Sequence, residues 1–146
     1  MRGPLHLLGR QDDQELNAFP SANEDIAEAG NCIAFERAIT CVMHLMRALE
    51  VTLAALASKV GISKQNDWGS YIRAIGNELE RRSKTAGART VDEQFYSEAA
   101  VNFDHLKRAW RNPSMQVEKT YTQDHAEAIL LAVKSFMSHI ATKISE

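Results

Sequence analysis

The sequence has few residues of the kinds that interrupt helices or build sheets. Its 146 residues include only three prolines and seven glycines. Alternating runs of β-branched residues, which are typical of strands, are also scarce. The composition therefore favours an all-α fold. A hydrophobic fraction of 45% and a charged fraction of 25% are ordinary for one soluble globular domain, and the length suffices for a real core.

Motifs for metal, cofactor and phosphate binding are missing as well. The sequence has no Cys-x-x-Cys, no His-x-x-x-His and no acidic pair at ligand spacing, so we expect no metal site and no cofactor. A glycine-rich phosphate loop is also lacking. Cys32 and Cys41 are predicted to lie on one helix, with their Cα atoms roughly 13 Å apart, which excludes a disulfide between them. Both are interpreted as small core residues of a protein in a reducing compartment.

No segment has the composition of a signal peptide or a membrane span. The apolar run at residues 5–8 is too short for a signal peptide. The longest apolar stretch, residues 41–60, is interrupted by Arg47 and Glu50. The sequence therefore predicts a cytoplasmic protein that does not bind a membrane.

The net charge of −2 is unevenly distributed. Residues 1–36 hold two basic and seven acidic side chains, whereas the remaining 110 residues hold fifteen basic and twelve acidic ones. The positive excess after residue 36 permits contact with a phosphate backbone without requiring it. Residues 1–20 are interpreted as an acidic leader, poorly structured or with a short helical turn at 12–18. Residues 21–146 are predicted to form a single helical domain.

Periodicity predicts a long first core helix. Ser21-x-x-Glu24 matches a capping box at its start, and Gly61 is expected to end it. Gly30 either bends this helix or marks its true beginning. Its apolar residues recur at spacings of 4-3-4-3-4-3-4, as one packing stripe requires. They are Phe35, Ile39, Val42, Met46, Leu49, Leu53, Leu56 and Val60. Because its other face is also largely apolar, we expect it at the centre of a bundle or at a subunit interface.

Three further helices follow. The second is predicted over residues 67–82, before a solvated loop over 81–89. A second capping box, Thr90-x-x-Glu93, opens the third helix, and Pro113 is expected to end it. The fourth begins near Thr122. Their expected inner faces are Trp68, Ile72, Ile75 and Leu79; Phe95, Ala99, Phe103, Leu106 and Trp110; and Ile129, Val133, Phe136 and Ile140. Short connections favour an antiparallel bundle of four to five helices.

The segment between the last two predicted helices carries the most specific pattern. Arg111, Asn112 and Gln116 lie in Arg-Asn-Pro-Ser-Met-Gln, which follows Leu-Lys-Arg-Ala-Trp. With residues of the last helix, this segment resembles the HEPN superfamily (higher eukaryotes and prokaryotes nucleotide-binding), especially bacterial members with Trp-Arg-Asn-x-x-Met-His before a final helix. The downstream residues that share the resemblance are Tyr121, Thr122, Ala126, Ile129, Val133, Phe136 and Met137. Residues 41–50 and 67–69 are similar to that group's first helix and following loop, so the resemblance covers roughly residues 28–141.

This resemblance implies a HEPN-like bundle that forms a homodimer and cleaves RNA without metal. By position, Arg111 matches the catalytic arginine and Asn112 the polar residue after it, while Gln116 occupies the histidine position. An arginine fork fits phosphate oxygens, and a histidine would supply the base that helps the 2′-OH attack. Glutamine cannot act as that base, and losing it typically costs a factor of about 10² to 10⁴ in rate. The resemblance therefore implies binding of RNA or a nucleotide in a dimer cleft, with weak or lost ribonuclease activity.

Other polar residues are candidates for the same cleft. The basic residues near the motif are Lys107, Arg108 and Lys119. His44 and Arg47 belong to a second set with Glu50, in which Arg47 and Glu50 are close enough to pair at i,i+3. This set either lines the cleft or forms a satisfied polar network at a helix or dimer seam. Arg111 itself has a plainer alternative, a surface arginine near a helix C-terminus.

Two more questions stay open at the level of sequence. His105 and His125 are the histidines that could replace the missing base, and an exposed histidine without a role is the alternative for each. The chain could instead be a non-enzymatic dimerisation or interaction module, with an antitoxin-like protein partner in a bacterial phage defence or toxin–antitoxin system. The broad apolar surface of the first helix and the acidic leader motivate this second hypothesis.

Overall fold

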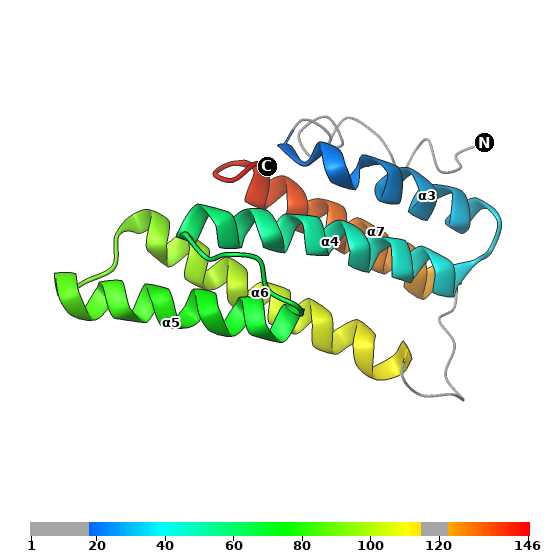
Figure 1. The fold of residues 1–146 in the computed structure, drawn as a ribbon. Coiled ribbons are helices and arrows are strands. Elements are labelled where there is room, and N and C mark those ends of the chain that lie inside the picture. The colour runs from blue at the N-terminus through cyan, green and yellow to red at the C-terminus, as the bar shows by residue number, and fades with distance from the viewer. Residues whose placement is uncertain (1–17, 115–122) are drawn as a thin grey trace.

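A computed structural model describes residues 18–114 and 123–146, with side chains left out at 109–114. The described part is helical and contains no strand, so the all-α prediction is confirmed (Figure 1). A 3₁₀ turn, η1 (Pro20–Ala22), precedes five α-helices. These are α3 (Asn23–Ala34), α4 (Ala38–Val60), α5 (Trp68–Ala86), α6 (Val91–Ser114) and α7 (Gln123–Ala141).

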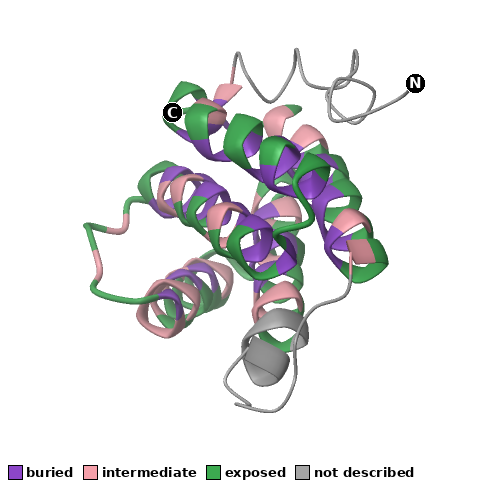
Figure 2. Ribbon diagram, turned by 90° about the vertical axis from the view of Figure 1, so that its right-hand side faces the viewer, coloured by how far each residue is buried: buried purple, intermediate pink, exposed green. Residues whose placement is uncertain are grey.

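Helix α4 is the centre of the bundle. It contacts α3, α5, α6, α7 and η1, while α3 also contacts α7 and α5 also contacts α6 (Figure 1). Buried residues face inward from every helix, and exposed residues lie on the outer sides (Figure 2). The helical-bundle prediction is therefore confirmed, and α4 lies at the centre of the bundle, which is one of the two positions expected for the first core helix.

The core is built largely from the predicted inner faces. Leu49, Leu53 and Leu56 of α4 are fully buried. Phe103 of α6 is also fully buried, with its ring edge-on to Trp68 at 6.3 Å and to Phe136 at 4.8 Å between centroids. These ring contacts join α5, α6 and α7 beside α4.

The single long first helix is a wrong prediction. Residues 35–37 interrupt it, and Glu36 takes a positive φ of 56°. The chain reverses there, so that α3 packs against α4, and Arg37 N donates to Cys32 O at 2.8 Å. Gly30 lies inside α3 and marks neither a bend nor a start. The apolar spacing in the sequence continues across this turn and therefore does not reveal it. Its first two members, Phe35 and Ile39, are exposed and do not pack in the core.

The capping box expected at Ser21 is also not formed. The N-cap of α3 is Ala22, and it makes no side-chain hydrogen bond. Ser21 instead donates its backbone N–H and its hydroxyl to the carboxylate of Glu146, at 2.7 and 2.5 Å. Glu146 N in turn donates to Ala18 O at 2.9 Å. A partner 125 residues away competes successfully with the local capping pattern. Phe19, assigned to the leader from the sequence, is fully buried in the core.

Other helix boundaries were predicted more closely. Gly61 adopts the left-handed conformation (φ 88°) at the end of α4. The second capping box forms as expected, with Thr90 N donating to Glu93 Oε1 at 2.9 Å and Glu93 N donating to Thr90 Oγ1 at 3.1 Å. The expectation that Pro113 ends the third helix is wrong, because α6 continues through Asn112 and Pro113 to Ser114. A proline this close to a terminus removes only one helical hydrogen bond.

Helix α5 also extends beyond its predicted end. It continues to Ala86, so most of the expected loop over 81–89 is helical. Ion pairs within the helix support the extra turn: Glu78 with Arg81 and Arg82, and Glu80 with Lys84. Gly87, with a φ of 83°, then ends the helix.

Helix α4 is long and apolar enough to cross a membrane by length and composition alone. Half of its most apolar window is buried inside the bundle. The central helix of a soluble bundle has these same properties, so this feature is weak evidence for a membrane span.

Candidate functional site

Helix α6 carries several of the basic residues that are expected to bind phosphate. Lys107 and Arg111 are four residues apart on this helix, so their backbone positions share one face and lie one turn from each other. Asn112 follows in the last turn of α6, whose side chains there are outside the described part. Gln116 and Lys119 also lie outside the described residues.

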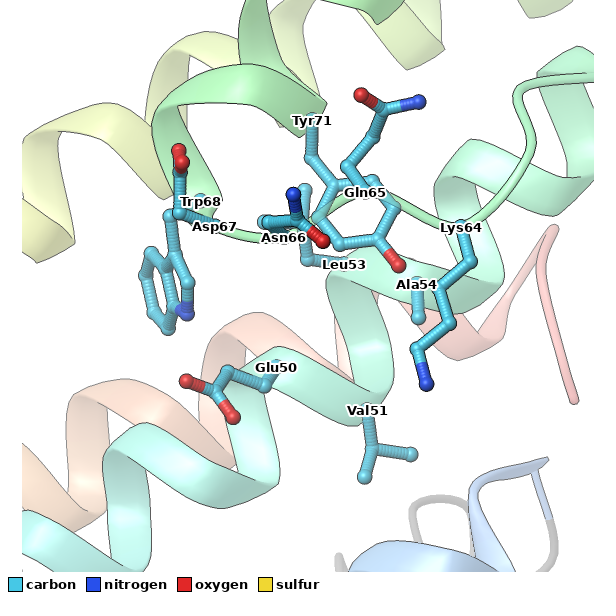
Figure 3. A pocket seen from close by; sticks show the side chains of 10 residues that line it. All are labelled: Glu50, Val51, Leu53, Ala54, Lys64, Gln65, Asn66, Asp67, Trp68 and Tyr71. Carbon is cyan, nitrogen blue, oxygen red and sulfur yellow. The ribbon is translucent and has the colours of Figure 1, made fainter.

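Lys107 lines a surface depression of about 250 Å³ between α4, α5 and α6. The residues around it are Met46, Glu50, Asn66, Asp67, Trp68 and Lys107. A second depression of about 360 Å³ adjoins it and shares Glu50, Asn66, Asp67 and Trp68. Its remaining lining residues are Val51, Leu53, Ala54, Lys64, Gln65 and Tyr71 (Figure 3). We call the two together the Trp68 groove.

The start of α5 forms one wall of the Trp68 groove. Asp67 is the N-cap of that helix, since its carboxylate accepts from Ser70 N at 2.8 Å and from Ser70 Oγ at 3.2 Å. The backbone hydrogen bond from Ser70, followed by the hydroxyl hydrogen bond and the nearby charge of Lys107, lowers the pKa of the Asp67 carboxyl. Asp67 is therefore ionised at neutral pH and holds the first turn of α5 in place.

Lys107 reaches the start of α5 beside Gly69. A Cβ atom at this position would lie 3.3 Å from Asp67 Oδ1 and 3.6 Å from Lys107 Nζ. The first of these contacts is tighter than side chains normally make. The Asp67-Trp68-Gly69 segment thus supplies a helix cap and an aromatic ring close to the ammonium group of Lys107.

The lining of the Trp68 groove suits binding better than acid–base chemistry. It combines two lysines, two carboxylates and the aromatic side chains of Trp68 and Tyr71, together with the amides of Asn66 and Gln65. In Figure 3 the Glu50 side chain reaches from α4 toward Trp68 on α5. No histidine is among the described residues that line either depression. The groove therefore offers hydrogen bonds, aromatic surface and charge, but no group that normally titrates near neutral pH.

The structure separates the members of the second polar set, His44, Arg47 and Glu50. His44 Nδ1 lies 2.8 Å and Arg47 Nε 3.5 Å from Asp25 Oδ1 on α3. Arg47 thus pairs with Asp25 instead of Glu50, which lines the Trp68 groove. Because Asp25 is only 8% exposed, the polar network at a helix seam is the interpretation that the structure favours. His44 lies about 160° around α4 from Met46, so it faces away from Lys107.

The remaining candidate residues and histidines that the structure describes do not line the Trp68 groove. Arg108 is exposed and pairs with Asp104 at 3.0 Å. His105 is exposed on α6, and His125 is exposed in the first turn of α7. The ring of His139 lies 5.1 Å from that of Phe95, far along α7 from its start. Within the described residues, no histidine joins Lys107 at the groove.

The two cysteines are free thiols on different helices, Cys32 on α3 and Cys41 on α4. Burial raises the pKa of Cys41 to about 12, and the neighbouring Cys32 adds to the shift. Burial, then the negative charge of Glu28, also raises the pKa of Cys32. Both thiols are thus protonated at neutral pH and are not nucleophiles in this state.

Trp68, Asn66 and Tyr71 are groove residues whose contribution the sequence did not indicate. The sequence predicted Trp68 only as a residue on the inner face of its helix, and no recognisable motif marks the connection after Gly61.

Comparison of the chain with known protein families, with curated proteins and with solved structures finds no match to it.

Proposed function

We propose that this chain is a HEPN-like helical domain that binds RNA or a nucleotide as a homodimer, with weak or lost metal-independent ribonuclease activity. The observation that supports this function best is the shared face of α6, where the backbone positions of Lys107 and Arg111 are one turn apart and Lys107 lines the Trp68 groove. Both residues are cations of the kind that binds phosphate oxygens, and arginine does so through two parallel hydrogen bonds.

The groove offers contacts for a base next to those cations. Tyr71 is half-buried and can present part of its ring to a ligand, whereas Trp68, only 8% exposed, lines the groove from the core side. Stacking on aromatic rings tolerates any base, and the amide of Asn66 adds a donor and an acceptor. Lys64 supplies a further positive charge at the rim. In this mode the phosphates lie along α6 and the base lies toward α5.

The catalytic half of the proposal depends on Gln116. Its amide can hydrogen-bond a 2′-OH but cannot remove a proton from it. No histidine of the described residues replaces it at the groove. Binding is accordingly the main activity, and cleavage is slow or lost.

The binding test compares Arg111→Ala with Arg108→Ala, because Arg108 is already paired with Asp104 on the same helix. We expect Arg111→Ala to weaken binding of a short single-stranded RNA and to reduce the salt dependence of its affinity by about one phosphate contact. Arg108→Ala should change both the affinity and its salt dependence less. RNA that does not bind the natural protein, or binds Arg111→Ala equally well, contradicts the proposal.

The cleavage test compares the natural protein with Gln116→His. We expect little or no 2′,3′-cyclic-phosphate product from the natural protein, and more from Gln116→His, by a factor of up to about 10² to 10⁴. If the two proteins cleave equally, Gln116 does not occupy the position of the base.

One observation favours the non-enzymatic alternative, a dimerisation module. Phe35, Ile39 and Met43 are spaced by four residues and are 70%, 47% and 61% exposed. An apolar row of this kind is typical of a surface that another chain covers. Under this alternative, Ile39→Glu converts a dimer into a monomer in light scattering, and RNA binding is absent from both forms. A protein that is monomeric before the substitution would contradict both readings.

A further inference from the structure

Three side chains that commonly bind metal ions meet between α3 and α4. Glu28 and Cys32 are one turn apart on α3, and His44 faces them from α4. A carboxylate oxygen, the Cys32 sulfur and a ring nitrogen of His44 all lie within 4.8 Å of one another. We propose that Glu28, Cys32 and His44 form a site for a divalent transition metal ion of the zinc class, with water in the fourth coordination position.

The donor set fits zinc in kind and nearly in geometry. Thiolate, imidazole and carboxylate are the three protein donors that zinc uses, usually in tetrahedral arrangement. Cys32, protonated in the metal-free protein, releases its thiol proton to solvent when the ion binds. With bonds of about 2.0–2.3 Å, tetrahedral donors lie roughly 3.3–3.8 Å apart. The three side chains therefore need to draw together by up to about 1.0–1.5 Å.

Asp25 orients the histidine of this site. His44 Nδ1 lies 2.8 Å from Asp25 Oδ1. A carboxylate only accepts, so Nδ1 carries the proton, and neutral His44 keeps its lone pair on Nε2 for a metal ion. A carboxylate behind a metal-binding histidine is a common arrangement that fixes the ring and strengthens the ligand. Asp25 is therefore a positioning residue, itself held by Arg47 at 3.5 Å.

A path from solvent leads to the site. Glu28 and Cys32 line a surface depression of about 260 Å³, whose other residues are Asn31, Phe35 and Arg37. Cys32 is only 5% exposed, but this depression brings solvent to its side of α3. Glu28 stands at the surface, where it accepts a hydrogen bond from Asn31 Nδ2 at 3.2 Å. Glu28 brings a negative charge to the mouth of this depression, and the charge of Arg37 lies across from it.

Cobalt(II), which replaces zinc in such sites and is coloured, provides the test. Added to the full chain under reducing conditions, it should produce a thiolate-to-metal charge-transfer band that zinc then abolishes. Cys32→Ala should lose this band, whereas Cys41→Ala, which removes a buried thiol outside the site, should keep it. Absence of the band in the natural protein overturns the proposal. So does a band that survives in Cys32→Ala, or one that Cys41→Ala loses as well.

Two milder variants keep the test decisive if Cys32→Ala fails to fold. Glu28→Gln changes a ligand at the surface, and Asp25→Asn changes only the residue behind His44. We expect Asp25→Asn to weaken zinc binding in calorimetry by about 10- to 100-fold while the cobalt band persists. Glu28→Gln should weaken binding as well. Zinc affinity that neither variant changes would show that the ion binds elsewhere.

Discussion

At the scale of single residues, the start of α6 is held by side chains rather than by packing. Thr90 and Glu93 satisfy each other's backbone N–H groups, and both hydrogen bonds are exposed to solvent. We expect Thr90→Ala to lower the free energy of unfolding by about 1 kcal/mol, the usual cost of a lost N-cap. Urea unfolding measures this change in free energy. Thr85→Ala is the control, because Thr85 bonds only to the carbonyl of Arg81 within α5 and should cost less.

Acid should weaken the ion pairs of α5 in a defined range. Hydrogen bonds from Arg81, then from Arg82, lower the pKa of Glu78 from 4.5 to about 2. Because this pKa is lower in the folded state, the stabilisation is present above the unfolded value and is lost as pH falls from about 4.5 toward 2. The Tm difference between the natural protein and Glu78→Gln should therefore shrink over this range. A difference that stays constant down to about pH 2 would contradict this assignment.

At the scale of elements, the turn between α3 and α4 stores backbone strain at Glu36. Its φ of 56° suits glycine better than a residue with a side chain. We expect Glu36→Gly to leave the free energy of unfolding unchanged or to raise it by up to about 1 kcal/mol, since relief of strain is offset by a freer unfolded chain. Glu36→Val should lower it, because β-branched residues tolerate positive φ worst. Thermal unfolding of the three proteins distinguishes these outcomes, and a Tm that Glu36→Val does not lower would show that the turn carries no strain.

This turn also shows where prediction from sequence ends. The helices themselves follow from apolar spacing, and the cap at Thr90 and the stop at Gly61 follow from local chemistry. The break at residues 35–37 has no glycine or proline to announce it, and the apolar period runs straight through. Only the packing of α3 back onto α4 determines it.

The same unpredicted turn hid the candidate metal site from prediction by sequence. With α3 and α4 merged into one helix, Cys32 and His44 are twelve residues apart along a rod and cannot share a ligand. The reversal at Glu36 brings them together. The basic face of α6, by contrast, depends only on the spacing of Lys107 and Arg111 along one helix, which the sequence states directly.

At the scale of the whole molecule, Phe103 is the residue on which α5, α6 and α7 converge. It is fully buried, with edge-on contacts to the rings of Trp68 and Phe136. We expect Phe103→Ala to lower the free energy of unfolding by about 3–5 kcal/mol through lost burial and the cavity left behind. Val101→Ala, at a position 51% exposed on the same helix, should change it by less than about 0.5 kcal/mol. Denaturant unfolding compares them, and equal losses would mean that Phe103 is not in the core.

The central position of α4 has a consequence for how the protein opens. Since α4 contacts each of the other four α-helices in the described part of the chain, its backbone amides become accessible only when the whole bundle comes apart. The last turn of α5 is mostly exposed and can fray without disturbing that centre. Deuterium should therefore enter α4 last, at the rate of global unfolding, and enter residues 83–86 of α5 far sooner. Hydrogen exchange is then slow in the central helix and faster at the exposed ends of the helices around it.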